Sequence, residues 1–377
     1  MLTKTDNTLV EIMLEFVRSA VFEREPVIPN NEIIDWDKMM DMALEHGLLG
    51  WVYDGIFSLS ENGQIPRQQL ISWGLSAQEQ TSQYFLQQEF LDNMIKVCDN
   101  NDMKLLLLKG ISLSEYYPKP SSRLSCDIDI YLFGDYEKGN RLLLDGDVNL
   151  AEKHYVYNKG GIQVENHIWL IDMGTPLQRK VEDYLESTLN SCVKTKYGYY
   201  VLPSKSLVLY LLMHLLAHLN NPQNDPIKIR SIIDFGMVLK TINADIMDDI
   251  KSIIFKFDLS RSYMLFVELA EWALSFDLSR YKFFEFESKD IQSALQLILD
   301  ENLRHPTYIQ SPKYKEMFKR WSHYKQIRWR YKYLPTMERK RVLFFMNDFF
   351  HDVVKSLLGM SPKDSIRSKF KIGRSRI

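Results

Sequence analysis

The sequence has few cysteines and no long hydrophobic run. Its three cysteines, Cys98, Cys126 and Cys192, lie far apart in a chain of 377 residues, which excludes a disulfide framework and the paired spacing of a structural zinc site. The most apolar stretch, residues 207–219, is interrupted by two histidines and is too short to span a bilayer core of about 30 Å. The first residues carry acidic side chains where a signal peptide is apolar. We therefore expect a cytoplasmic protein without stable membrane anchoring.

Net charge is also low, at −2, but it is unevenly distributed. Residues 313–377 hold 18 of the 47 Lys and Arg residues and only 5 of the 49 Asp and Glu residues. In residues 313–341 the basic side chains alternate with aromatic ones, a composition suited to nucleic-acid strands. The same aromatic residues fall at helical spacing, which equally favours a packed amphipathic helix. RNA binding through residues 313–377 is thus one prediction, and a packed helix is the other.

The composition is otherwise that of a globular protein, with 45% hydrophobic and 25% charged residues. Apolar residues recur at helical spacing in the first hundred residues and again after Pro203. Between these parts the pattern changes to short apolar runs and to alternating polar and apolar residues, both typical of strands. The predicted strands are residues 104–108, 126–132, 153–157, 162–170 and 197–202.

These patterns predict an α+β protein with a small mixed β-sheet core. We expect an N-terminal helical region over residues 1–103, the sheet over residues 104–202, and a C-terminal helical region with a basic tail over residues 203–377. The first region should end in a long helix over residues 66–98, and the last should begin with a helix over residues 204–219.

Two aspartates two residues apart lie on one predicted strand. In Asp127-Ile128-Asp129-Ile130 both carboxylates point to the same face of the sheet and both isoleucines to the other. Such carboxylates repel each other unless a cation or a proton neutralises them, and Mg²⁺ binds to one or two carboxylates together with substrate phosphates. Two solvated carboxylates on an edge strand explain the same pattern without a metal.

A single-glycine turn, Lys109-Gly110-Ile111-Ser112, joins the first predicted strand to a short predicted helix. In such a turn the glycine lets a phosphate approach the backbone, while Ser112 offers a hydroxyl and Lys109 a positive charge. Arg123 is a further candidate for holding a phosphate oxygen. The alternatives are an ordinary strand-to-helix turn and a surface arginine, because one glycine is a weak signal.

Polar residues also share one face of the second strand of the predicted hairpin. They are Gln163, Glu165 and His167. Glu165 is a candidate third carboxylate, brought to the aspartates by the sheet rather than by sequence proximity, and His167 is a second-tier candidate. A solvent-facing carboxylate is the alternative for Glu165.

Two pairs of residues four positions apart lie on the predicted helices after the sheet. His214 and His218 have the spacing of a zinc pair, but the helix lacks the glutamate of the HExxH motif, and histidines among leucines are more often packed in a core. Arg230 and Asp234 have the spacing of a helical ion pair. All four are second-tier candidates for the site.

Six sequence segments together resemble the uncharacterised bacterial nucleotidyltransferases of the DNA polymerase β-like superfamily. They are LLLLKG, YYPKPSSR, DIDI, VENHIW, LLMHLLAHL and IRSIIDFG, within about residues 104–240. The resemblance implies that Asp127 and Asp129 bind two Mg²⁺ ions, with Mn²⁺ as an alternative, and that Glu165 completes the metal site. It also implies that Gly110 and Ser112 hold the nucleotide phosphates.

Such a protein would transfer a nucleoside monophosphate from an NTP, expected to be ATP, to a hydroxyl group and release pyrophosphate. The acceptor would be a small molecule, a sugar or an RNA end, and Glu165 or Asp129 would accept the hydroxyl proton. Ile111 stands where the superfamily usually has a small residue, which favours an alternative, a nucleotide- or nucleic-acid-binding module without turnover. A helical scaffold with incidental acidic residues is a third interpretation.

Overall fold

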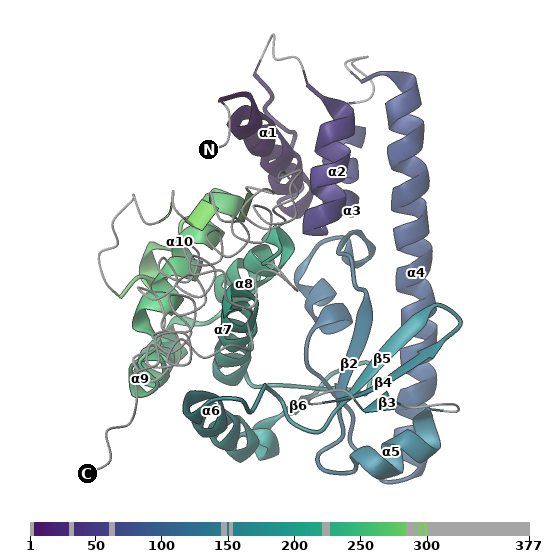
Figure 1. The fold of residues 1–377 in the computed structure, drawn as a ribbon, viewed down its shortest axis with the longest axis vertical. Coiled ribbons are helices and arrows are strands. Elements are labelled where there is room, and N and C mark those ends of the chain that lie inside the picture. The colour runs from purple at the N-terminus through teal and green to yellow at the C-terminus, as the bar shows by residue number, and fades with distance from the viewer. Residues whose placement is uncertain are drawn as a thin grey trace, which may run out of the picture.

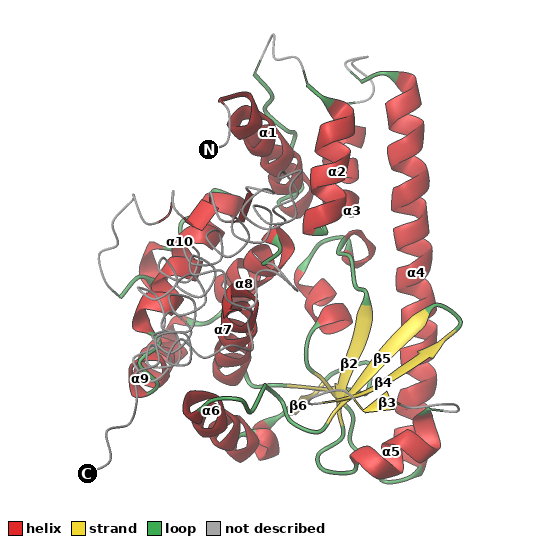
Figure 2. Cartoon of the chain, in the orientation of Figure 1, coloured by secondary structure: helices red, strands yellow, loops and turns green. Residues whose placement is uncertain are grey.

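In a computed structural model of the chain, helices surround one mixed sheet (Figures 1 and 2). The α+β class predicted from the sequence, with helical regions on both sides of a small mixed sheet, is confirmed. The structure describes residues 4–29, 34–59, 65–144, 149–150, 154–220 and 227–283, with Ile291, Ala294, Leu295, Ile298 and Leu299. The basic segment 313–377, and with it the predicted RNA contact, lies outside the described residues.

Among the described residues, four helices precede the sheet. They are α1 (Lys4–Val21), α2 (Trp36–His46), α3 (Leu49–Phe57) and α4 (Arg67–Asn100). The Asp35 side chain caps α2 by accepting from the Lys38 amide at 3.0 Å. Helix α4, predicted over residues 66–98, begins directly after Pro66 and runs for 34 residues along one side of the molecule, beside the sheet (Figure 1).

The described part of the sheet consists of seven strands in the order β3-β4-β5-β2-β1-β7-β6. They are β1 (Leu106–Leu107), β2 (Asp127–Tyr131), β3 (Asn149–Leu150), β4 (His154–Lys159), β5 (Ile162–His167), β6 (Val193–Lys194) and β7 (Tyr200–Val201). Strand β2 lies in the middle, antiparallel to β1 and parallel to β5. The predicted hairpin is β4–β5, and it brings β5 beside β2.

Alternation along β2 decides what each face of the sheet contacts. Ile128 and Ile130 are fully buried in one apolar cluster with Leu91 and Met94 of α4. Asp127 and Asp129 occupy the alternate positions and therefore face away from α4. Helix α4 thus covers the apolar side of the sheet and leaves the acidic side to the helices that follow.

Six helices follow β2 in the part of the chain that the structure describes. They are α5 (Tyr136–Leu143), α6 (Pro176–Ser187), α7 (Ser204–Asn220), α8 (Ile229–Thr241), α9 (Met247–Lys256) and α10 (Ser260–Leu274), with short 3₁₀ turns η2 (Gly110–Tyr116), η3 (Pro120–Ser122), η4 (Leu189–Ser191), η5 (Ala244–Ile246) and η6 (Ser279–Tyr281) elsewhere. A second apolar core joins residues of α1, α3, α7, α8 and α10. Within the described part of the chain, no helix has the length and hydropathy needed to cross a membrane.

Candidate active site

Three carboxylates from two adjacent strands converge on the acidic side of the sheet. The parallel register of β2 and β5 places Asp129 opposite Glu165, with Asp127 two residues earlier on β2. One carboxylate oxygen from each of the three residues lies within 4.8 Å of the others. The structure therefore brings together the three side chains that the sequence pattern singles out.

Asp129 is fully buried between two basic groups. Its Oδ2 lies 2.8 Å from Lys109 Nζ, and its Oδ1 lies 3.0 Å from His167 Nε2. Lys109 Nζ is also 3.8 Å from Asp127 Oδ2. Lys109 and His167 are thus the immediate neighbours of the carboxylate group, and both were candidates from the sequence.

The pKa values follow from these contacts. Burial alone would raise the pKa of Asp129, but Lys109 and His167 hold it well below its usual range. Burial and the neighbouring Asp129 instead raise the pKa of Asp127, although Lys109 opposes this shift. Burial would lower the pKa of Lys109, but Asp129 and Asp127 raise it. The negative charge on the two aspartates is therefore only partly compensated by Lys109, and a further cation would relieve the repulsion.

The turn after β1 lies directly beside the aspartates. Gly110 has φ +67°, and a Cβ at this position would lie 3.0 Å from Asp127 O and 3.0 Å from Ser125 Oγ. The turn leads into the 3₁₀ helix η2, in which Ser112 is 8% exposed and donates its hydroxyl to Lys109 O at 3.3 Å. The backbone at Gly110 therefore approaches β2 as closely as only glycine allows.

A Gly110→Ala variant is expected to lose about 1–3 kcal/mol of stability, because alanine is strained in the left-handed backbone conformation and its Cβ pushes on Asp127 O. Its apparent KM for a substrate bound at this turn should rise more than the stability loss explains, since β2 and Lys109 shift together. Urea denaturation and initial-rate kinetics measure the two effects. Gly134→Ala is the matched control, because Gly134 has φ +97° but a Cβ added there would meet nothing within 4 Å.

Arg123 supports this turn from inside the protein. It is 3% exposed, so it is not the surface arginine considered as one alternative. Its Nε and Nη2 donate to the two Asp234 oxygens at 2.8 and 2.7 Å, and its Nη1 donates to Gly110 O at 2.7 Å. Tyr117 donates its hydroxyl to the same Asp234 at 2.7 Å. Arg123 is thus a positioning residue for Gly110, and a contact to phosphate stays a prediction.

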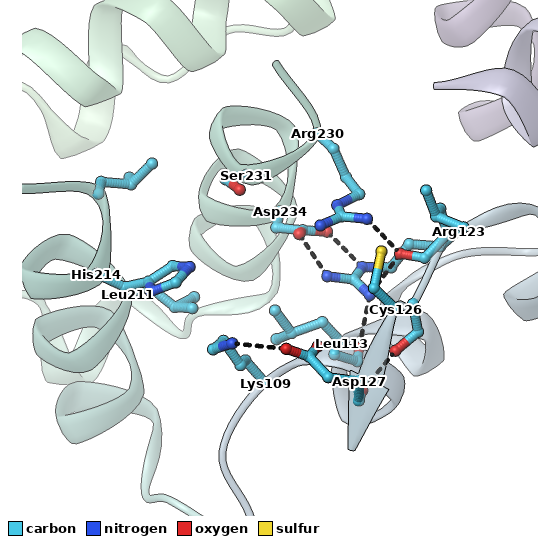
Figure 3. Close-up of a pocket in the computed structure, with 14 residues that line it drawn as sticks. Lys109, Leu113, Arg123, Cys126, Asp127, Leu211, His214, Arg230, Ser231 and Asp234 are labelled. Atoms are coloured by element: carbon cyan, nitrogen blue, oxygen red, sulfur yellow. Dashed lines mark hydrogen bonds and ion pairs between the residues drawn. The ribbon is translucent and has the colours of Figure 1, made fainter. Parts of the chain in front are cut away.

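Arg230 and Asp234 were considered as a helical ion pair, but in the structure each side chain binds a partner that is distant in the sequence. Asp234 binds Arg123, 111 positions away, through both of its oxygens. Arg230 donates its Nη1 to Leu124 O at 2.8 Å. Both side chains therefore attach α8 to the segment that precedes β2, as Figure 3 shows.

A pocket opens between the acidic face of the sheet, α7 and α8 (Figure 3). Arg230 and Ser231 come from the first turn of α8, and His214 from α7. His218 Nε2 lies 3.0 Å from His214 Nε2, and neither belongs to a group of three potential metal ligands among the described residues. The pocket is lined by Lys109, Gly110, Leu113, Arg123, Leu124, Ser125, Cys126, Asp127, Leu211, His214, Leu215, Arg230, Ser231 and Asp234.

Comparison with known proteins gives one match. The family model described as "Uncharacterised nucleotidyltransferase" matches residues 32–275, well over half of the chain. The chain belongs to this family. The match includes the sheet with α5 and α6 between its strands, α2 to α4 before it and α7 to α10 after it, and so extends beyond the segment whose motifs resemble the family. Neither the curated proteins nor the solved structures contain a significant match.

In this nucleotidyltransferase, the loop before β2, residues 119–126, is held by side chains that the sequence analysis missed. Gln80 of α4 donates to Ser122 O at 2.9 Å, and Gln87 donates to Ser125 O at 3.2 Å. Both glutamines are buried. The sequence contained one indication of these contacts. Gln80 and Gln87 lie seven residues apart on one face of a long helix, and buried side-chain amides need hydrogen-bond partners.

His154 is a second missed residue at the site of this nucleotidyltransferase. It lies on β4 directly opposite His167, and its Nδ1 is 3.5 Å from Glu165 Oε2. Counting outward from the predicted turn at residues 158–161 pairs His154 with Glu165, whereas the observed turn is only Gly160 and Gly161 and pairs Lys159 with Ile162 and His154 with His167.

Proposed function

We propose that this protein transfers a nucleoside monophosphate from an NTP to a hydroxyl group of an acceptor and releases pyrophosphate. The observation that carries the proposal is the convergence of Asp127, Asp129 and Glu165 within 4.8 Å, beside a basic pocket. Membership of a nucleotidyltransferase family supports the reaction class. We take ATP as the expected donor, and a small molecule, a sugar or an RNA end as the acceptor.

The three carboxylates suit a divalent cation. An all-oxygen donor set that leaves room for substrate phosphates is the kind that Mg²⁺ prefers, and Mn²⁺ accepts it as well. The raised pKa of Asp127, caused by burial and by Asp129, marks negative charge that a cation would compensate. When bound, Mg²⁺ would neutralise phosphate charge and lower the pKa of the attacking hydroxyl.

Basic side chains of the pocket supply the complementary contacts to phosphate. Lys109 faces both aspartates, and Arg230 lines the pocket from the start of α8. Gly110 lets the backbone carry Lys109 and Ser112 close to β2. We assign the NTP phosphates to this pocket, where Lys109 and Arg230 orient them over the carboxylates.

We take Glu165 as the proton acceptor, with Asp129 as the alternative. Asp129 is fully buried between Lys109 and His167, whereas Glu165 is half-buried and so more accessible to an acceptor. Burial would raise the pKa of Glu165, but its contact with His167 lowers it, so accessibility and not pKa is the ground for this choice. Asp127 and Asp129 would then be the principal metal ligands, with Glu165 completing the group.

Incubation of the protein with each α-³²P-labelled NTP, Mg²⁺ and a cell extract is expected to label a product with release of pyrophosphate. Chelation by EDTA should abolish the labelling, and added Mg²⁺ or Mn²⁺ should restore it, because the carboxylates cannot hold the phosphates unaided. Binding of NTP without any labelled product, over the four nucleotides and several extracts, would instead support the binding-module alternative.

A further inference from the structure

A second group of potential metal ligands lies beside the three carboxylates. His154 of β4 and Glu165 and His167 of β5 each offer one ligand atom within 4.8 Å of the others. The two imidazoles face each other across the β4–β5 pair, with ring centroids 5.0 Å apart. Glu165 Oε2 lies 3.5 Å from His154 Nδ1 and 3.7 Å from His167 Nε2. Glu165 is therefore common to both groups.

The donor atoms of this second group differ in kind from those of the first. Two imidazole nitrogens and one carboxylate oxygen form a set typical of Zn²⁺ and other first-row transition metals, whereas Mg²⁺ takes oxygen ligands. The three side chains are all buried or half-buried, and they project from two hydrogen-bonded strands. The sheet thus fixes their spacing before any ion arrives.

The orientation of the His167 ring supports a role as a ligand. Its Nδ1 lies 3.2 Å from Trp169 O, and a carbonyl oxygen can only accept, so Nδ1 carries the proton of this hydrogen bond. The other nitrogen, Nε2, lies 3.7 Å from Glu165 Oε2 and 3.0 Å from Asp129 Oδ1, and a metal ion bound at Nε2 would replace its hydrogen bond with Asp129. A backbone carbonyl that holds the far nitrogen in this way is the usual partner of a metal-binding histidine.

We propose that His154, Glu165 and His167 form a binding site for a transition-metal ion of the Zn²⁺ class, and that occupancy of this site inhibits nucleotidyl transfer. Inhibition follows from the shared carboxylate. Both histidines face Glu165 Oε2, while Oε1 accepts a hydrogen bond from Gln163 Nε2 at 3.0 Å. A metal ion at the histidines takes the oxygen that the carboxylate group with Asp127 and Asp129 requires. This second step rests on the proposed function, whereas the binding itself does not.

Zn²⁺ binding is tested by isothermal titration calorimetry of the full chain with ZnCl₂ in excess Mg²⁺. We expect one Zn²⁺ per chain, with a Kd raised by more than about 100-fold in His154→Ala, because loss of a ligand should exceed the 10–100-fold effect of losing an outer partner. His154→Gln is the second variant if His154→Ala fails to fold. His218→Ala, which disrupts the other histidine pair, should bind Zn²⁺ as the wild type does. Asp127→Asn should bind Zn²⁺ no more weakly than the wild type, because it removes none of the three ligands and only weakens the competing Mg²⁺ group.

Inhibition is tested by measuring the transfer rate of each protein with Zn²⁺ and Mg²⁺ and comparing it with the rate of the same protein in Mg²⁺ alone. Zn²⁺ should lower transfer by the wild type and leave the His154 variants much less affected. Zn²⁺ affinity unchanged in both His154 variants, or lost equally in His218→Ala, would overturn the proposed site. Zn²⁺ binding that depends on His154 but leaves transfer unchanged would overturn the inhibition. If the wild type transfers no nucleotide at all, the proposed function fails, while the calorimetry still decides on the site.

Discussion

Asp127→Asn with Asp129→Asn is expected to reduce nucleotidyl transfer by at least about 1,000-fold, because a divalent cation contributes several kcal/mol to stabilising charge in the transition state. Asparagine keeps the size of each side chain but removes the negative charge that holds the cation. The two positions lie on β2 with their isoleucine neighbours buried on the opposite face, so the strand itself keeps its packing. Initial rates with labelled NTP measure the effect.

The matched control removes two negative charges elsewhere. Asp99 of α4 and Asp249 of α9 are 55% and 58% exposed and pair with Lys194 and Lys205 on the surface. Asp99→Asn with Asp249→Asn should therefore leave transfer unchanged and stability within about 1 kcal/mol of the wild type. Circular dichroism without metal must show a folded protein for both double variants. Transfer that persists in the Asp127 and Asp129 variant would show that these residues do not carry the reaction.

Arg123→Met alone, or Asp234→Leu alone, is expected to cost about 3–5 kcal/mol of unfolding free energy, because each leaves an uncompensated charge in the interior. Both side chains are about 4% exposed and joined by two hydrogen bonds of 2.7 and 2.8 Å. The double variant removes both charges and should lose much less than the sum of the two single losses. Urea denaturation of the four proteins gives the coupling energy.

The double variant should still have a lower free energy of unfolding than the wild type. Gly110 O loses its donor and the Tyr117 hydroxyl loses its acceptor, each with a penalty of about 1–3 kcal/mol if the group stays buried. Since Gly110 belongs to the candidate phosphate turn, the apparent KM for NTP should also rise. Lys194→Met, which breaks an exposed pair, is the control and should change stability by less than about 1 kcal/mol. Additive losses in the double variant would contradict a coupled ion pair.

The carboxylate group was predictable because short-range rules decide it. Alternation along a strand assigns Asp127 and Asp129 to one face, and the apolar face of Ile128 and Ile130 assigns the other. The convergence of Glu165 depends on one more feature, the parallel register of β5 with β2. The sequence did not predict that register, and Glu165 was named from the polar face of its strand and from the resemblance to a family. His154 was missed, and its position opposite His167 depends on a two-residue turn at Gly160 and Gly161, whereas the sequence favoured a four-residue turn.

The partners of the buried charged side chains could not be predicted from local sequence patterns. A spacing of four positions on one helix favoured Arg230 with Asp234, whereas packing of α8 onto the loop before β2 gives Asp234 to Arg123. A buried carboxylate pairs with whichever donor the tertiary structure places beside it. The spacing of residues along one helix does not predict that donor. The short helices α5 and α6 were also missed, although Thr175 followed by Pro176 is a helix start, and the Thr175 hydroxyl does accept from the Gln178 amide at 3.2 Å.

The loop before β2 determines which parts of the chain the candidate site needs. Residues 119–126 are gripped by α3 through Asp54, by α4 through Gln80 and Gln87, and by α8 through Asp234. Strands β2 and β5 therefore could not be transferred alone into another chain, because the three helices that hold the loop, from both ends of the matched region, would have to be transferred with them. Substitutions on the surface of this protein can change which substrate it would act on, whereas the geometry of the candidate site depends on contacts throughout the fold.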